Sequence, residues 1–344
     1  MRVLRQLDFD FVRARALILE EGNIWDGSTL QLNCRTEYSD IAGEFGDPWA
    51  VIHRRDLGRE LRRLASCQSS TRRSVKIHYE SPVTDIDCEE GVLTMEDGSR
   101  IQKNIIIGAD GVDSLVAKHI INGRVDTTAY RTTFRFVIPT NKLLQNESTR
   151  ELFEGKSPAL NIAVSRDKRL VWYPCRNANE QNFVALHMTS RDHDNADSKD
   201  QADPQKCLLK EFDEFSPKIR EIFRLVDNIT FKSLSLQKPI KSWTKGKTVI
   251  IGNAAHFMLP HQGQCESQGI EDAGALSVFL SRVNSGKDIP GRLMCFQKAR
   301  WNRTAALQIL SSVAQDQAQD EAEKVEEASI YIRGHIPRTP LEFN

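Results

Sequence analysis

The chain has 344 residues, with 47 basic and 47 acidic side chains, so its formal net charge at pH 7 is zero. Hydrophobic residues make up 40% and charged residues 27%, as in ordinary soluble globular proteins. This length allows one or two domains with sizeable cores. The balanced charge gives no electrostatic case for a nucleic-acid partner.

Seven cysteines are scattered along the chain without a C-x-x-C pair or a histidine cluster. This pattern predicts reduced thiols in an intracellular, cytoplasmic protein and no metal site. No apolar run approaches the ~18 residues that span a bilayer, so no transmembrane segment is expected. The N-terminus alternates charges at Arg2, Arg5, Asp8 and Asp10, unlike a secretory signal.

The first third of the chain predicts short elements separated by turns. Residues 1–16 predict a helix that runs into a turn, and residues 17–24 and 29–34 predict strands around Asp26-Gly27. Further short strands are expected at three places: residues 75–79, 83–87 and 91–95.

Residues 50–65 predict a strand followed by a helix. Asp56 is placed to cap that helix. The arginines along the helix predict a solvated basic face, with the exception of Arg54, which opens an H-R-R-D-L stretch.

A strand, a tight turn and a helix are predicted over residues 105–118. The apolar run 105–107 is typical of a buried strand, the segment from Gly108 to Gly111 predicts the turn, and Asp113 is the expected N-cap.

Residues 127–138, 160–164, 170–173 and 182–187 have strand lengths and patterns, and they predict an antiparallel sheet. Within it, Trp172 and Tyr173 are candidates to line an aromatic pocket. Because strand side chains alternate, one of the two is expected in the core. A polar surface loop at 191–205 and helices broken near Pro217 follow.

The segment 248–276 organises the rest of the chain. It predicts a buried strand, a turn at Gly252, a proline loop with Gly263, and a helix from about Ser267. A backbone bends in this way where it approaches a ligand closely and aims free N–H groups at an anion or a polarised carbonyl.

These segments together resemble the group A flavoprotein monooxygenases, the salicylate-hydroxylase-like aromatic-ring hydroxylases. The family motif G-D-A-A-H-x-x-x-P-x-x-G-Q-G-x-N-x-x-x-E-D is matched in nine places, and the family's G-A-D-G-x-x-S-x-V and H-R-x-D-L motifs are matched near residues 108 and 53. The nine matches are Gly252, Ala254, Ala255, His256, Pro260, Gly263, Gln264, Glu271 and Asp272.

The resemblance implies an oxidoreductase that holds FAD and uses NADH or NADPH and O2 to hydroxylate a small phenolic substrate, in catabolism or secondary metabolism. It implies that Arg54 reaches the flavin phosphates and that amides near Gly263 stabilise charge on the flavin. The cofactor-binding residues so implied are Arg54, Asp110, Gly252, Asn253, Ala255, Pro260, Gly263, Gln264 and Cys265. Catalytic residues stay unassigned.

The chain departs from the family motif at Asn253, Cys265, Glu266 and Ser267. No G-x-G-x-x-G is present, so the family's first βαβ unit is expected to be missing, through natural truncation, a late start codon or a partial gene model. Its loss should leave an exposed sheet edge and an apolar patch. The alternative function is therefore a non-catalytic or fragmentary relative that has lost FAD.

The implied fold class is α/β with an α+β insertion: an incomplete glutathione-reductase-type FAD-binding domain interleaved with an antiparallel-sheet substrate domain. Residues 1–125 and 240–330 are expected to form the FAD-binding domain, 126–239 the substrate domain and 331–344 a C-terminal tail. The substrate, its hydroxylation position, the choice of NADH or NADPH and the oligomeric state stay open.

Overall fold

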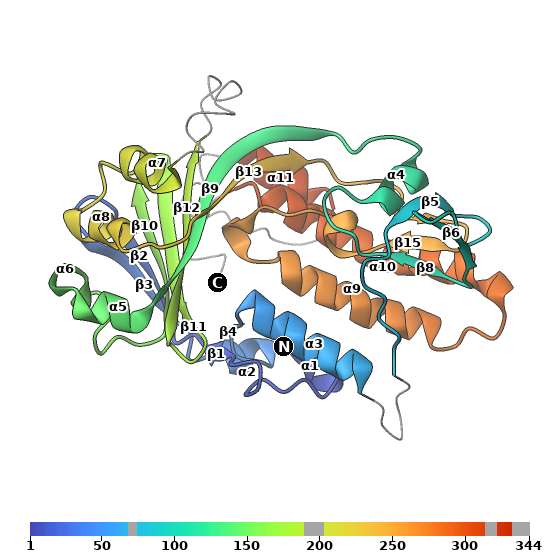
Figure 1. The fold of residues 1–344 in the computed structure, drawn as a ribbon, viewed down its shortest axis with the longest axis horizontal. Helices are drawn as coiled ribbons and strands as arrows, with labels where there is room; N and C mark the ends of the chain where they lie inside the picture. Colours follow the sequence, from blue (N-terminus) through green and yellow to red (C-terminus); the bar gives the residue numbers. More distant parts are fainter. Residues whose placement is uncertain (68–73, 189–202, 314–321, 332–344) are drawn as a thin grey trace. The chain divides into compact units, whose positions relative to one another are not determined.

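The computed structural model describes residues 1–67, 74–188, 203–313 and 322–331 (Figure 1). Its contacts divide the chain into two units: residues 1–77 with 129–234, here unit 1, and residues 78–128 with 235–344, here unit 2. Most of the surface loop expected at 191–205 and of the tail expected at 331–344 lies outside the described residues.

A seven-stranded sheet forms the centre of unit 1, in the order β13-β9-β12-β11-β10-β2-β3. The antiparallel pairing expected for four of these strands is confirmed, whereas β2 joins β10 in parallel. The strands are β2 (Glu21–Asp26), β3 (Leu32–Glu37), β9 (Thr127–Pro139), β10 (Ala159–Ser165), β11 (Lys168–Cys175), β12 (Glu180–Met188) and β13 (Thr230–Gln237).

The parallel pair of β2 and β10 changes the expected grouping of the chain. Residues 1–77 group with residues 129–234, and not with residues 78–128, because β2 and β3 belong to the same sheet as β9 to β12.

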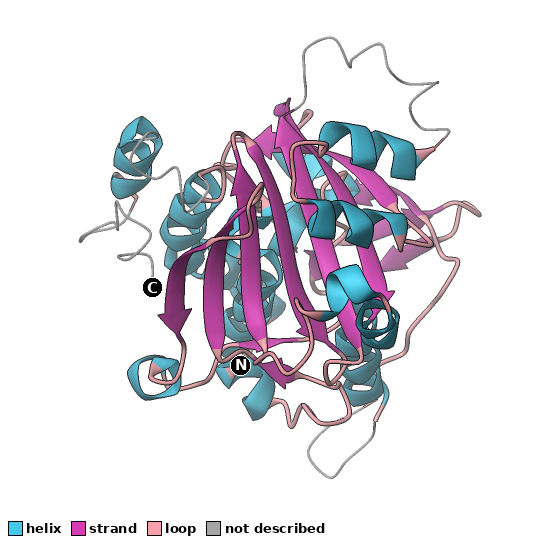
Figure 2. Ribbon diagram, turned by 90° about the vertical axis from the view of Figure 1, so that its left-hand side faces the viewer, coloured by secondary structure: helices cyan, strands magenta, loops and turns pink. Residues whose placement is uncertain are grey.

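Four helices cover one face of the seven-stranded sheet (Figure 2). Aromatic side chains from the strands, such as Phe136 and Phe183, pack there against Leu208 and Phe223 from the helices. A proline at the first turn of the last two helices sets their starts and explains the break near Pro217. The helices are α5 (Thr140–Gln145), α6 (Glu147–Arg150), α7 (Pro204–Glu211) and α8 (Pro217–Arg224).

The N-terminal elements differ from the prediction. The helix expected within residues 1–16 is short and ends at Gln6, and the expected turn follows it, with Asp8 and Arg15 in left-handed backbone angles (φ 56° and 52°). Residues 75–79 form no strand. The observed elements are α1 (Arg2–Gln6), β1 (Leu17–Ile18), α2 (Ile41–Phe45), β4 (Ala50–Val51) and α3 (Arg54–Ser66).

Asp56 anchors α3 and does not cap it. The cap is His53, whose ring accepts a hydrogen bond from the Arg55 amide. The fully buried Asp56 carboxylate accepts from Arg15 at 2.7 Å and from Arg176, the residue after β11, at 2.9 Å, and it also pairs with Arg59. These ion pairs connect α3 to the segment that follows β11. Asp56 therefore stabilises this contact and does not cap the helix.

Unit 2 contains two small sheets. One has the order β14-β15-β8, and β15 and β8 run parallel. The other is the antiparallel meander β5-β6-β7. The strands are β5 (Val83–Asp87), β6 (Val92–Met95), β7 (Arg100–Gln102), β8 (Ile106–Gly108), β14 (Thr244–Lys245) and β15 (Thr248–Ile250).

Helices enclose the core of unit 2, which includes Trp243, Val249 and Phe296. They are α4 (Leu115–Ile121), α9 (Cys265–Leu280) and α10 (Ile289–Leu310), whereas α11 (Ala322–Ser329) packs on α10 in a separate apolar cluster (Figure 1). In the described parts of the chain, no helix combines the length and apolar character that crossing a membrane requires.

Candidate functional site

The loops that follow β8 and β15 leave from the same edge of the parallel pair. Ile106 is opposite Thr248 and Gly108 is opposite Ile250, so both strands end level with each other. In open α/β sheets, ligands bind beyond the carboxyl ends of the strands. Most of the residues predicted to hold a cofactor lie in these two loops.

Asp110 orders the first loop and the start of α4. Its carboxylate accepts hydrogen bonds from the Ser114 hydroxyl at 2.6 Å and from the Val116 amide at 3.2 Å. Ser114 caps α4 by accepting from the Ala117 amide at 2.8 Å, so the predicted cap at Asp113 is wrong. Ser114 is the N-cap because its hydrogen bond to Asp110 holds its hydroxyl oxygen next to the free N–H groups at the start of α4.

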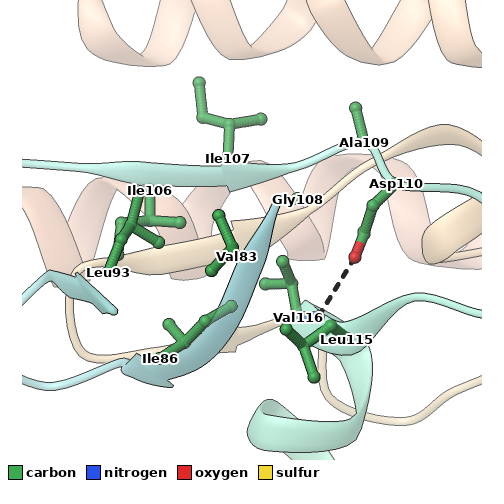
Figure 3. A pocket seen from close by; sticks show the side chains of 10 residues that line it. All are labelled: Val83, Ile86, Leu93, Ile106, Ile107, Gly108, Ala109, Asp110, Leu115 and Val116. Carbon is green, nitrogen blue, oxygen red and sulfur yellow. Dashed lines mark hydrogen bonds between the residues drawn. The ribbon is translucent and has the colours of Figure 1, made fainter. Parts of the chain in front are cut away.

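A pocket of about 420 Å³ lies beside this loop (Figure 3). Apolar side chains from β5, β6, β8 and α4 line it, and Asp110 is the one acidic side chain in the lining. On the outer side, β8 has no pairing partner among the described residues, and the Ile107 side chain is 43% exposed. β8 is therefore an edge strand among the described residues, with the apolar Ile107 exposed on it.

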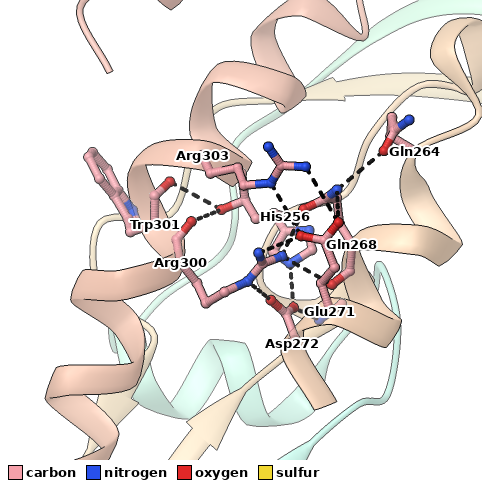
Figure 4. Close-up of polar contacts among 10 residues, drawn as sticks. His256, Gln264, Gln268, Glu271, Asp272, Arg300, Trp301 and Arg303 are labelled. Atoms are coloured by element: carbon pink, nitrogen blue, oxygen red, sulfur yellow. Dashed lines mark hydrogen bonds and ion pairs between the residues drawn. The ribbon is translucent and has the colours of Figure 1, made fainter. Parts of the chain in front are cut away.

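The second loop is locked by a buried acid (Figure 4). One oxygen of the Asp272 carboxylate accepts from the Gly252 amide at 2.9 Å and from His256 Nε2 at 2.6 Å. The other oxygen accepts from Arg300 Nε at 2.8 Å. Asp272 is fully buried, so this network joins the turn after β15 to α9 and α10 without access to water.

Arg300 extends the network. Its remaining nitrogens donate to Glu271 at 2.7 Å and to the side chain of Gln268 at 2.7 Å. Gln268 in turn donates to Gln264 Oε1 at 3.2 Å. A chain of hydrogen bonds thus runs from the buried Asp272 to the N-terminal end of α9.

Burial alone raises the pKa of the Asp272 carboxyl, but the hydrogen bonds from His256, Gly252 and Arg300 outweigh burial and lower it. Burial also raises the pKa of Glu271, but the hydrogen bonds and positive charges of Arg303 and Arg300 outweigh burial, so the pKa is lowered. Both carboxylates are therefore ionised at neutral pH and serve as structural anions.

Two glycines in left-handed conformation shape the second loop. Gly252 (φ 58°) begins the turn and packs on Gly269 of α9: a Cβ at position 252 would be 3.8 Å from the Gly269 Cα. Gly263 (φ 62°) precedes α9, is exposed, and has no atom within 4 Å of where a Cβ would sit. The backbone at Gly263 is therefore open to a ligand's close approach.

The remaining predicted residues of this loop fall around Gly263. Pro260 begins a short 3-10 turn, Gln264 precedes α9, and Cys265 starts it. The Cys265 thiol is directed to the Met258 carbonyl at 2.8 Å, so it does not block the approach from solvent. Asn253 is half-buried and Ala255 fully buried.

The predicted site residues are divided between the two units. Arg54, the first residue of α3, is exposed and belongs to unit 1. Trp172 packs in the core of unit 1, whereas Tyr173 lies half-buried on the opposite face of the sheet. No group of acidic, histidine or cysteine side chains in the described ranges could hold a metal ion.

Sequence reasoning missed the role of Arg300. Glu271 and Asp272 were recognised as motif residues, but their partner lies 28 or 29 residues later on another helix. The sequence contained one local signal, which is the pair of adjacent acids on a helix. An acid that is buried requires a cationic partner, so this pair indicated a cation elsewhere in the chain.

Residues 3–309 match a family model described as an FAD binding domain. FAD-dependent monooxygenase phomE' of Diaporthe leptostromiformis is 31% identical over 341 residues, which cover 97% of this chain and 84% of the relative. 3-Hydroxybenzoate 6-hydroxylase 1 of Aquipseudomonas alcaligenes is 29% identical over 287 residues, 79% of this chain and 65% of the relative. A solved salicylate hydroxylase substrate complex superposes with a TM-score of 0.70 at 18% identity, covering 98% of this chain and 89% of that one.

Proposed function

Because the chain belongs to the family of FAD-dependent monooxygenases, which are oxidoreductases, we propose that it hydroxylates a small phenolic substrate with NADH or NADPH and O2. The relationship to a 3-hydroxybenzoate hydroxylase supports an aromatic substrate. The observation that carries the proposal is the second loop, where the Asp272 network holds an exposed left-handed glycine at the start of a 16-residue helix.

FAD is the cofactor of this family, and the residues of the second loop fit it. The first N–H groups of a helix have no acceptor within the helix, so the start of α9 presents donors to a polarised or anionic group. Gly263 leaves room for close approach, and Pro260 stiffens the backbone before it. We assign the flavin contacts to Gly252, Asn253, Pro260, Gly263, Gln264 and Cys265, whereas Ala255, which the sequence also suggested, is fully buried and supports the turn from below.

When bound, FAD would supply the redox chemistry, while the protein supplies position and charge stabilisation. The α9 amides would stabilise negative charge on the ring system. Glu266 follows them, and its side chain is exposed, so solvent screens its opposing charge.

The remaining assignments rest on the family resemblance. Asp110 would orient the first loop for the nucleotide, as its bonds to Ser114 and Val116 allow. Arg54 would reach the phosphates, which its planar guanidinium suits. Although residues 1–77 pack with residues 129–234, we assign flavin binding to residues 1–125 and 240–330, and the interleaved substrate domain, with Tyr173 in its chamber wall, to residues 126–239.

FAD retention after desalting, read from the visible absorbance of oxidised flavin, tests this proposal. Gly263→Val should weaken FAD binding about tenfold or more, which is roughly 1.4 kcal/mol. The matched control is Gly155→Val in unit 1, because Gly155 has nearly the same backbone angle (φ 63°) and equally open surroundings. Equal loss in both variants would show that backbone strain, and not the site, is responsible.

The departures at Asn253 and Cys265 motivate the second candidate, a relative that has lost FAD and serves as a binding module. A folded chain that stays colourless after incubation with FAD would favour it. A coloured chain that oxidises NADH or NADPH faster with added phenols would favour the monooxygenase.

A further inference from the structure

Strand β8 is the edge of the three-stranded sheet β14-β15-β8, and no strand pairs with its other side in the described parts of the chain. Its bonds to β15 show how its backbone is oriented. The Ile106 amide donates to the Lys247 carbonyl at 3.0 Å, and the Gly108 carbonyl accepts from the Ile251 amide at 2.9 Å. The hydrogen-bonding groups of these two β8 residues are therefore directed toward β15.

The alternate residues of this segment direct their backbone groups to the open side. The direction of hydrogen bonding alternates along a strand, so Ile105, Ile107 and Ala109 present their N–H and C=O groups away from β15. This side is accessible, because the Ile107 side chain is 43% exposed and Ala109 is also exposed. Ile107 points to the side of β8 opposite Ile106 (Figure 3). Such an edge is a template for another strand.

The edge carries none of the features that prevent strands from pairing. Exposed edge strands are usually protected by a charged side chain, a proline or a bulge. Residues 105–109 read Ile-Ile-Ile-Gly-Ala, without charge or proline, and the pairing of β8 with β15 has no register shift. The composition of β8 therefore favours the addition of a further strand.

The open side of β8 is complementary to itself. In an antiparallel pair with a two-fold axis at Ile107, this residue exchanges both backbone hydrogen bonds with Ile107 of a second copy. In the same register, Ile105 of each copy exchanges both bonds with Ala109 of the other. A second copy in this register therefore satisfies every outward-directed backbone group from residue 105 to residue 109.

The charges at the two ends of β8 favour the same arrangement. The exposed Lys103 precedes the strand, and the exposed Asp110 and Asp113 follow it. An antiparallel pair brings the basic end of one copy beside the acidic end of the other, and it does so twice because of the two-fold axis. A parallel pair would instead bring like charges together.

We propose that two copies of this chain associate through β8, which joins their three-stranded sheets into one continuous sheet across a two-fold axis. Main-chain hydrogen bonds supply the register, and the exposed Ile107 side chains contact each other at the centre. The inference goes beyond the proposed function and does not depend on whether the chain retains FAD.

Sedimentation velocity of the full chain, with and without FAD, measures self-association over a wide range of concentrations. We expect an equilibrium between monomer and dimer. Lys103→Glu should weaken the dimer about tenfold, because it creates a like-charge contact at both ends of the interface. Adding Asp113→Lys to this variant should restore dimerisation. Lys298→Glu on α10, which is also an exposed lysine, is the matched control and should leave the dimer unchanged.

Disulfide cross-linking tests the register of the two strands. Ile107→Cys should form a disulfide between two copies of position 107, because the two-fold axis passes between them. Ala109→Cys is the matched control, since its two copies would be about 14 Å apart in this register, too far for a disulfide. A mixture of Ile105→Cys and Ala109→Cys should cross-link to each other. Mass spectrometry of the linked peptides distinguishes these bonds from those of the native cysteines.

Three results would overturn the inference. The first is a chain that stays monomeric at every concentration, with or without FAD. The second is a dimer that Lys103→Glu does not weaken. The third is a dimer in which position 107 forms no disulfide, or in which position 109 cross-links to itself as readily, because the copies would then meet at another surface or in another register.

Discussion

Replacing Asp272 by Asn removes one charge from the buried network and nearly preserves its shape. The carboxylate accepts from three donors: the Gly252 amide, His256 Nε2 and Arg300 Nε. Because Asp272 can only accept, His256 must carry its proton on Nε2. An asparagine has one oxygen and one NH2 group, so either orientation sets a donor against a donor.

The expected loss of stability follows from the burial of the ion pair between Asp272 and Arg300. Asp272 is fully buried and the Arg300 side chain is 8% exposed, so their pair is shielded from solvent. Removing one partner of such a pair costs about 3–5 kcal/mol. Arg300 keeps Glu271 at 2.7 Å, so we expect the lower end, about 3 kcal/mol in the free energy of unfolding.

Urea unfolding of the wild type and the variant at pH 7, followed by tryptophan fluorescence, measures this loss. The control is Arg303→Gln, which removes an ion pair whose arginine is 58% exposed and should cost about 1 kcal/mol or less. Asp272→Asn should also weaken FAD retention, because the network holds the turn at Gly252. A loss below about 1 kcal/mol would refute the network's structural role.

Three further substitutions have defined outcomes. Burial raises the pKa of Asp56, but hydrogen bonds from Arg15 and Arg176 lower it from 3.8 to about 2. Asp56→Asn should therefore cost about 2 kcal/mol at pH 6, and urea titrations should show the difference shrinking as the pH falls from 3.8 toward 2. Gly108→Ala places a Cβ 2.6 Å from Val116 and should destabilise by about 1–3 kcal/mol in thermal unfolding, whereas Gly123→Ala meets no atom within 4 Å and should not. Ile107→Lys puts a charge on the unpaired edge of β8 and should weaken self-association in analytical ultracentrifugation about tenfold or more, unlike Val278→Lys on α9.

Local patterns predicted the elements with strong periodicity. The antiparallel strands β9 to β12 and the helices that break at Pro217 appear where the sequence indicated them. The buried strand and the turn at Gly252 were also predicted, because apolar runs and glycines act over a few neighbouring residues.

Partners distant in sequence were decided by the tertiary structure alone. Arg300 meets Asp272 because two helices pack together, and β2 joins β10 because the sheet extends across a long separation. Asp56 fits a helix cap by position, yet its ion pair with Arg176, 120 residues away, determines its role. Periodicity specifies which face of an element is apolar, but which charges meet on the buried side depends on how the elements pack.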